Sequence, residues 1–382
     1  MRRAVGTGGS GRGHGAPWHA PPIDAAALRS EFPVLDEVAY LNAGTNGPVP
    51  LRARVAADEA LGVQVEQGRG GSAFFEGLLI PAARTLRERI ARLLGCDASE
   101  VALTGSTTDG VNSVLSGLDL GPRDEVLTSD QEHPGLLVPL ALGARRRGFR
   151  LREAPFAGLA GAVGPETTLV ACSHVSWVTG QLVDAEALAA AGAPVLLDGA
   201  QGLGAVRTDV AELGCDFYAA SGQKWLCGPN GTGYLYVRAE RLADLHPAWP
   251  GYLTLAAPDR PLDLELREQT DRLDLGLLPF EHSVWAAASL DVLEAAGFDD
   301  VLTAGVDRAE ELAAQLAEAG RRVAPRGRST LVSWEEADPE ATSRRLAEAG
   351  VVVRHLPGLP YVRASAGAWT GEEDVERLLR SL

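Results

Sequence analysis

Lysine is almost absent from this sequence. Of the 35 lysine and arginine residues in the 382-residue chain, only Lys224 is a lysine. Arginine keeps its proton in proteins, whereas a desolvated lysine can lose it and attack a carbonyl carbon. The lone lysine is therefore either an ordinary surface residue or one whose amine is needed. Its surroundings, CDFYAASGQKWLCGPNGTGYLYVR, are mostly apolar or small, which favours an amine with a function.

Cysteines are few, and their spacing argues against a zinc site. None of the four is in CxxC spacing and no histidine cluster accompanies them, so no metal site is expected. We expect free, buried thiols in a protein of the reducing cytosol. The cysteines are Cys96, Cys172, Cys215 and Cys227.

Long apolar runs are also missing. No stretch of 18 apolar residues occurs, so no transmembrane helix is expected. Residues 1–22 begin with basic residues but lack the apolar stretch of a signal peptide, and their Gly, Arg and Pro content predicts a disordered tail. The net charge of −16 makes nucleic acid and anionic membranes poor partners.

Strand-like and helical patterns alternate from Val101 onward, which predicts an α/β fold with a largely parallel sheet. Such sheets bind ligands beyond the carboxyl ends of their strands. The expected strands are 100–104, 124–128, 168–173, 194–198, 216–220 and 233–237. The helical patterns between them include 108–117, 134–147, 184–191 and 208–213, and helices are also expected before them at 25–32, 51–66 and 76–95.

The pattern changes after about residue 255. A Pro- and Asp-rich stretch, 256–275, is expected to cross between domains, and a small α+β domain follows it. Thr370 with Glu373 three residues later has the form of a capping box for the last helix. The expected helices are 279–296, 306–319, 338–348 and 371–381, and the expected strands are 329–334, 350–356 and 360–365.

Two predicted strand ends carry groups suited to binding a phosphorylated pyridine cofactor. Gly105-Ser106-Thr107-Thr108-Asp109 follows a strand and opens a helix, where free N–H groups and two hydroxyls favour a phosphate. A simple helix cap is the alternative interpretation. Asp198 ends the apolar strand of APVLLDGAQ, and a buried carboxylate there needs a partner such as a protonated pyridine nitrogen.

Other polar residues extend this set. Ser221 and Gln223 lie beside Lys224, and Gln201 is placed to hydrogen-bond a ring oxygen, with His174 as a further candidate. The imidazole of His133 can stack on a pyridine ring and carry protons, although a lone histidine is commonly structural. Arg363 lies between apolar residues in LPYVRASAG, so it needs an anion: a substrate carboxylate, or the partner in a structural salt bridge.

At these residues the sequence resembles the class V aminotransferase family of fold-type I pyridoxal-phosphate (PLP) enzymes. The similar segments are YLNAGTNGPVP, TGSTTDGVN, SDQEHPG, SHVSWVTGQ, DGAQGLGAV and SGQKWLCGPNGTGYLYVR. The resemblance, from about Ala39 to the end, implies a large domain with a mainly parallel seven-stranded sheet and a small α+β C-terminal domain. We place the large PLP-binding domain at 23–260, with its N-terminal segment packed partly on the small domain, and the interdomain helix and small domain at 261–382.

The resemblance also implies a role for each candidate residue. Lys224 would form the Schiff base with PLP and shuttle protons, Asp198 would pair with the pyridinium, and His133 would stack on the ring. The remaining roles divide among three sites: phosphate contacts (Thr107, Thr108, Ser221 and Gln223), contacts near the phenolic oxygen (Gln201 and His174), and the substrate carboxylate (Asn42 and Arg363). Family members are usually homodimers with the active site at the interface.

Three departures from the family pattern bear on function. Gln223 stands where many members have histidine, and Leu277 stands near the place of a hydroxyl that often reaches the partner's phosphate. No cysteine follows Cys227, whereas desulfurases need a nucleophilic thiol in the small domain. The expected reaction is therefore β-elimination of a C–S bond from a cysteine-type amino acid. Transamination or epimerisation is the alternative. A desulfurase, or a PLP-fold protein that binds without catalysis, is expected less.

Overall fold

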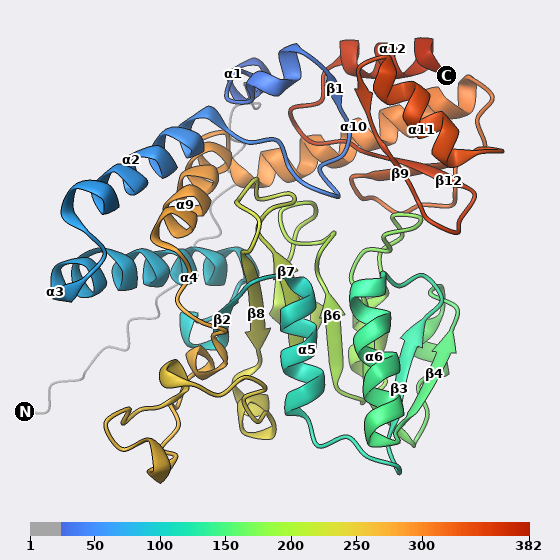
Figure 1. Cartoon of the computed structure of the whole chain (residues 1–382). Helices are drawn as coiled ribbons and strands as arrows, with labels where there is room; N and C mark the ends of the chain where they lie inside the picture. The colour runs from blue at the N-terminus through green and yellow to red at the C-terminus, as the bar shows by residue number, and fades with distance from the viewer. Residues whose placement is uncertain (1–23) are drawn as a thin grey trace, which may run out of the picture.

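A seven-stranded sheet forms the centre of the molecule, for which the computed structural model describes residues 24–382 (Figure 1). The strand order is β2-β8-β7-β6-β5-β3-β4, and within this sheet only β8 runs antiparallel to its neighbours. The strands are β2 (Val101–Thr104), β3 (Glu125–Ser129), β4 (Arg150–Ala154), β5 (Thr167–Ser173), β6 (Val195–Asp198), β7 (Phe217–Ser221) and β8 (Gly233–Val237). The α/β class and the mainly parallel seven-stranded sheet predicted from the sequence are confirmed.

Both faces of the sheet are covered by helices, so its inner strands are mostly apolar on both faces. Successive residues point to opposite faces: Leu196 packs in the core beneath α5 (Thr107–Gly117) and α6 (Pro134–Arg147), and Leu197 packs in the core on the other side. That second core includes residues of α4 (Ile80–Leu94), α7 (Ala185–Ala190), α8 (Val210–Leu213) and α9 (Phe280–Ala295).

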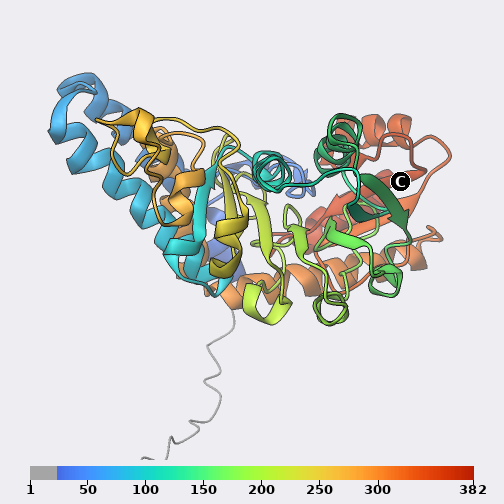
Figure 2. The same ribbon diagram turned by 90° about the horizontal axis from the view of Figure 1, so that it is seen from below.

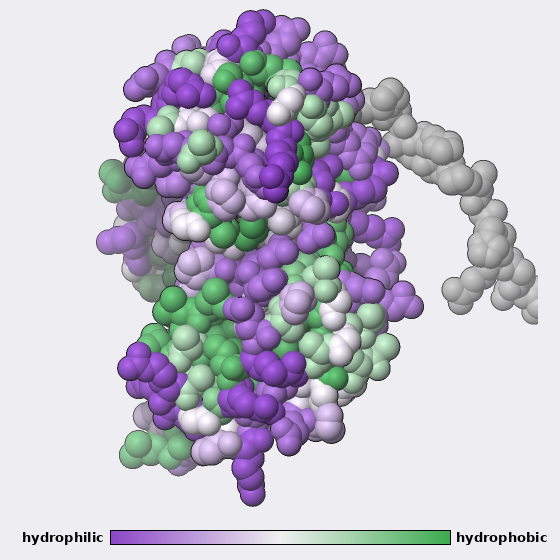
Figure 3. Space-filling model, turned by 90° about the vertical axis from the view of Figure 1, so that its right-hand side faces the viewer, coloured by the Kyte–Doolittle hydropathy of each residue, from purple (hydrophilic) through white to green (hydrophobic). Residues whose placement is uncertain are grey.

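The sequence pattern missed β4, which lies at the edge of the sheet. Its residues, RLREA, are mostly partly or fully exposed, because an edge strand has a neighbour on one side only. Arg150 and Arg152 both form ion pairs with the buried Glu125 of β3. Hydrophilic residues are abundant on this side of the molecule (Figure 3). A strand without an apolar run gives too weak a signal to be found from periodicity.

A smaller antiparallel sheet, in the order β11-β12-β9, lies above the carboxyl ends of the large sheet in Figure 1. A short parallel pair, β1 with β10, joins the N-terminal segment to the C-terminal part of the chain. These elements are β1 (Ala39–Tyr40), β9 (Leu331–Glu335), β10 (Val351–Val352), β11 (Arg354–His355), β12 (Tyr361–Ser365), α10 (Phe298–Glu318), α11 (Pro339–Glu348) and α12 (Glu372–Ser381). The domain boundary near residue 260 stays a prediction, and the predicted tail lies outside the described residues.

Three local predictions for the C-terminal part were wrong. Helix α10 begins at Phe298 rather than 306, directly after Gly297, whose φ of 83° ends α9. The strand expected at 350–356 is divided into β10 and β11. The final helix is capped at Gly371, whose N–H donates to Asp374, because the Thr370 hydroxyl instead accepts from Gly367 N–H.

The first N-terminal helix lies beside the small-sheet region, where Arg29 forms an ion pair with Asp374 of α12, whereas the next two extend away from it (Figures 1 and 2). These three helices are α1 (Ala25–Ser30), α2 (Leu51–Gln67) and α3 (Gly71–Phe74), and a π-helical turn, Phe75–Leu79, connects α3 to α4. The stretch 256–275 lies on the same side, against β2, and does not cross to the small sheet as the sequence predicted. No helix within residues 24–382 is both long enough and apolar enough to cross a membrane.

Candidate active site

A cavity of about 230 Å³ lies where the carboxyl ends of the parallel strands meet the small sheet. It brings together nine of the residues singled out in the sequence: Thr107, Thr108, His133, Asp198, Gln201, Ser221, Gln223, Lys224 and Arg363. Their side chains come from segments far apart in the sequence, so the sheet topology assembles the site. The role of each residue stays a prediction, and the contacts below show what each is free to do.

One end of the cavity is prepared for an anion. Helix α5 begins there at Thr107, and Ser106 caps it by accepting a hydrogen bond from Asp109 N–H at 3.1 Å. The hydroxyl oxygens of Thr107 and Ser221 and the amide oxygen of Gln223 are buried without a hydrogen-bond partner among the described residues. Buried polar atoms are rarely left unpaired, so the two hydroxyls fit a bound phosphate at this helix end.

Asp198 provides the negative charge of the cavity wall. It is buried at the end of β6 and accepts from Ala200 N–H at 2.9 Å. Burial raises the pKa of Asp198, while the nearby Lys224 acts against that rise. A buried carboxylate is costly without a cationic partner, and a protonated ring nitrogen provides one.

His133 is held in a defined orientation. It caps α6, and its Nδ1 accepts from Gly135 N–H at 2.9 Å, which leaves the proton of the neutral ring on Nε2. Burial and the cations Lys224, Arg354 and Arg363 lower the pKa of His133 to about 4, so the ring is neutral at pH 7. The indole ring of Trp177 meets it edge-on, with centroids 4.9 Å apart.

Lys224 follows β7 and lies in the same cavity as Asp198. Burial lowers the pKa of Lys224 to about 8; Asp198 opposes this shift, and Arg363 and Arg354 add to it. A lysine with an ordinary pKa carries very little neutral amine at physiological pH, whereas this one carries a substantial fraction. The site therefore prepares the only lysine of the chain for nucleophilic attack.

Two arginines face each other at the other end of the cavity. Arg363 of β12 is fully buried and donates to the Trp177 carbonyl at 2.7 Å, while its Nε has no partner among residues 24–382. Arg354 of β11 lies directly opposite Arg363 in the antiparallel pair. Sequence analysis missed Arg354, although the hairpin turn LPGLP between the two arginines indicates this pairing.

Three predicted site residues have other contacts. Asn42 lies behind the wall and accepts from Thr45, which itself faces the cavity. His174 also lies behind the wall, where its Nδ1 is 3.0 Å from the Tyr218 hydroxyl. Gln201 lines the cavity, but its amide already donates to the Gly44 carbonyl and accepts from Trp225.

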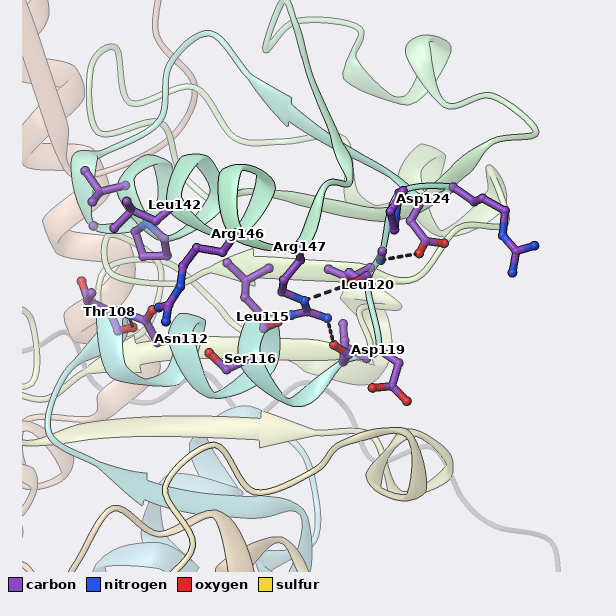
Figure 4. Close-up of a pocket in the computed structure, with 18 of the residues that line it drawn as sticks. Thr108, Asn112, Leu115, Ser116, Asp119, Leu120, Asp124, Leu142, Arg146 and Arg147 are labelled. Carbon is purple, nitrogen blue, oxygen red and sulfur yellow. Dashed lines mark hydrogen bonds between the residues drawn. The ribbon is translucent and has the colours of Figure 1, made fainter.

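A larger hollow, about 1320 Å³, lies between α5 and α6 (Figure 4). Thr108 lines both hollows, so this groove begins at the phosphate end of the site. Its far end is built by Arg147, whose guanidinium donates to the carbonyls of Leu115, Leu118 and Leu120. Lys224, Asp198 and His133 line only the smaller cavity, which is therefore the candidate active site.

Residues 67–378 match the family described as aminotransferase class-V. The chain belongs to this family. It is 35% identical over 225 residues to isopenicillin N epimerase from Streptomyces clavuligerus, a match that covers 55% of this chain and only 56% of the epimerase. It is 28% identical over 306 residues to a probable cysteine desulfurase from Methanothermobacter thermautotrophicus, covering 75% and 74% of the two chains.

The fold is also that of a solved PLP enzyme. The cystine C–S lyase C-DES, in complex with its reaction product cysteine persulfide, superposes with a TM-score of 0.87 at 28% identity, covering 91% of this chain and 98% of that one. Another structure of C-DES holds glycine linked to PLP. PLP is accordingly the cofactor of this class V enzyme, and the unpaired hydroxyls, Asp198 and Lys224 fit it.

Because Lys224 is the only lysine, capture of PLP by the apoprotein can be followed at one side chain. Since the neutral amine is the nucleophile, the capture rate relative to that of free Nα-acetyl-lysine will be greatest at low pH and will fall as pH rises above about 8. Stopped-flow absorbance across pH measures this ratio. Borohydride reduction should then label a single internal peptide, and Lys224→Arg should abolish the label. A ratio independent of pH would contradict the lowered pKa.

Proposed function

We propose that the protein cleaves the bond between Cβ and sulfur of a cysteine-type amino acid by β-elimination. The observation that carries this proposal is a cavity without a thiol: none of the described residues that line it is a cysteine. Cys172, Cys215 and Cys227 are buried in the core, and burial raises the pKa of the half-buried Cys96 to about 12. A desulfurase needs a thiolate to accept the sulfur, and this site offers none.

Each residue of the cavity has a separate part in the proposed reaction. PLP, when bound, withdraws electrons from Cα of the substrate. Arg363 binds the substrate carboxylate, and the neutral amine of Lys224 removes the α-proton. The electron pair of the Cβ–S bond leaves with the sulfur, which takes a proton from Lys224. Water then converts the released enamine to pyruvate and ammonia.

The second arginine indicates what the leaving group carries. Like charges directly across a strand pair destabilise it, yet Arg354 and Arg363 are paired, and the hydrogen bond of Arg354 is to the Thr45 hydroxyl at 3.2 Å. Once Arg363 holds the α-carboxylate and Asp198 pairs with the cofactor ring, Arg354 remains without an anion. We therefore propose a substrate with a second anionic group beyond sulfur, as in cystine.

Epimerisation is the second candidate, favoured by the similarity to isopenicillin N epimerase. The same lysine serves both reactions, because each begins with removal of the α-proton. The outcome depends on whether a leaving group at Cβ departs or a proton returns to Cα. Transamination differs again, since the proton then returns to the cofactor.

We further propose that two copies of the chain form a homodimer in a reducing compartment such as the cytosol, a proposal supported by its four free cysteines. Many exposed apolar residues belong to α2 to α4 and to the loop after β8, segments that lie on one side of the molecule (Figures 1 and 2). A surface of this kind is typical of an interface. It includes Leu51, Val55, Leu61, Val65, Phe75, Ile80, Trp249, Tyr252, Leu262 and Leu264.

Products distinguish the proposed reactions. L-cystine added to the PLP-loaded protein should give pyruvate and ammonia, identified by mass spectrometry, with no alanine. Lys224→Ala should abolish turnover, because the α-proton then has no base. Alanine as the product would mean desulfuration and would overturn the proposal. Recovery of D-cystine or meso-cystine without pyruvate would instead favour epimerisation.

Substitution of Arg354 tests the second anionic group. Arg354→Gln should lower kcat/KM for L-cystine roughly ten- to hundredfold, because a charge-assisted hydrogen bond is lost. The matched comparison is S-methyl-L-cysteine, which lacks a second carboxylate and should be affected much less. Steady-state pyruvate formation measures both. Equal losses for the two substrates would contradict the assignment of Arg354.

Solution mass tests the dimer. Light scattering should give twice the mass of one chain, and Val65→Asp combined with Phe75→Asp should shift it towards the monomer, since buried charges oppose association. Leu142→Asp, at an exposed apolar residue of α6 outside this surface, is the control and should stay dimeric. A wild-type protein that is monomeric at micromolar concentration would rule the proposal out.

A further inference from the structure

A buried carboxyl lies behind the active-site wall and has no part in the mechanism above. Glu132 immediately precedes His133 in the turn between β3 and α6, and only 4% of its surface is exposed. Each of its carboxyl oxygens accepts a hydrogen bond from a different serine: Oε1 from Ser129 and Oε2 from Ser173. Both acceptor atoms are thus used, and neither contact is with the cavity.

The two serines are the last residues of neighbouring parallel strands. Ser129 ends β3 and Ser173 ends β5, so the carboxyl of Glu132 connects the two strand ends. The β3–β5 register ends at Leu127–Val170, so no backbone pair of the ladder holds these ends together. In this region the side chain of Glu132 takes the place of the missing ladder contacts.

Each connected strand leads to a residue of the cofactor site. Beyond β3, the next residue after Glu132 is His133, which caps α6. In β5, Ser173 pairs directly with Asp198 of β6, and the following N–H, of His174, donates to the Asp198 carbonyl at 2.9 Å. Glu132 therefore lies at the junction between the segment that carries His133 and the one that holds Asp198.

Burial of this carboxyl has an electrostatic consequence. Burial raises the pKa of Glu132 to about 7. The hydrogen bonds from the two serines lower this pKa, and the nearby Asp198 raises it slightly. Asp198 contributes to this rise because two ionised carboxylates near each other repel. Burial raises the pKa of the Cys172 thiol of β5, and both carboxyls add to that rise.

We propose that Glu132 is a positioning residue, which sets His133 and Asp198 relative to each other by bridging the ends of β3 and β5. It acts on the cofactor indirectly, through the imidazole of His133 and the carboxylate of Asp198. Glu132 itself does not line the cavity. The inference rests on bound PLP and not on the bond that the enzyme breaks, so it holds for elimination and epimerisation alike.

Glu132→Ala and Glu132→Gln together test this role. In Glu132→Ala the visible circular dichroism of bound PLP should lose much of its amplitude and the dissociation constant of PLP should rise roughly tenfold, because both bridging hydrogen bonds are lost. Glu132→Gln should recover most of both signals, since an amide can accept from one serine and donate to the other. Neither readout requires a substrate.

Glu125→Gln is the matched control. Glu125 is a buried glutamate at the opposite end of β3, bound to Arg152 and Thr167. Its substitution should lower the melting temperature but leave the circular dichroism of the bound cofactor unchanged. This separates positioning of the cofactor from general stability of the sheet.

Ser173→Ala completes the test. If the bridge is the relevant unit, Ser173→Ala should shift the cofactor signal in the same direction, and the double variant with Glu132→Ala should be no worse than Glu132→Ala alone. Wild-type circular dichroism and PLP affinity in folded Glu132→Ala would overturn the proposal. Additive losses in the double variant, or an equal cofactor effect in Glu125→Gln, would overturn it as well.

Discussion

The site depends on the convergence of parallel strands at one edge of a sheet. Because β3, β5, β6 and β7 run in the same direction, their last residues, Ser129, Ser173, Asp198 and Ser221, reach a common edge. Backbone ladders hold most of this arrangement, and the side chain of Glu132 connects the two strands whose ladder stops short. A slip of one residue in any strand would turn its polar end into the core.

The cavity is lined by more cationic than anionic side chains. Among the described residues that line it, Lys224, Arg354 and Arg363 outnumber a single carboxylate, Asp198, so the protein provides an excess of positive charge. Burial, together with this excess of positive charge, lowers the pKa values of His133 and Lys224, which keeps the imidazole neutral and makes part of the amine nucleophilic. The phosphate of the cofactor and an anionic substrate would neutralise this excess of positive charge. The same imbalance thus favours binding of the cofactor and prepares the residue that reacts with it.

The small sheet contributes Arg354 and Arg363 to the cavity, and one segment after β5 joins it to the large sheet. Residues 177–180 accept hydrogen bonds from Arg363, Ser333 and Ser329 of the small-sheet region. Trp177, in the same segment, contacts His133. The arginine that would bind a carboxylate is therefore connected to the imidazole of His133 by a short run of backbone, which couples the positions of the two ends of the cavity.

The sequence by itself determined the class of fold, the cofactor and most of the residues around it. Buried parallel strands read as apolar runs, and a polar residue at the end of such a run is visible without a structure, as for Asp198; the single lysine needed only composition. Sequence analysis missed the edge strand β4, the first residues of α10 and the cap of α12. The residues of β4 are largely exposed and form no apolar run, and the ends of the two helices depend on backbone conformation and hydrogen bonds that sequence patterns do not specify. Tertiary structure alone decided that His174 and Asn42 lie behind the wall and that Glu132 bridges two strands. Each of these is a contact set by strand register or by packing between segments distant in the chain, and a local pattern carries no information about such a partner.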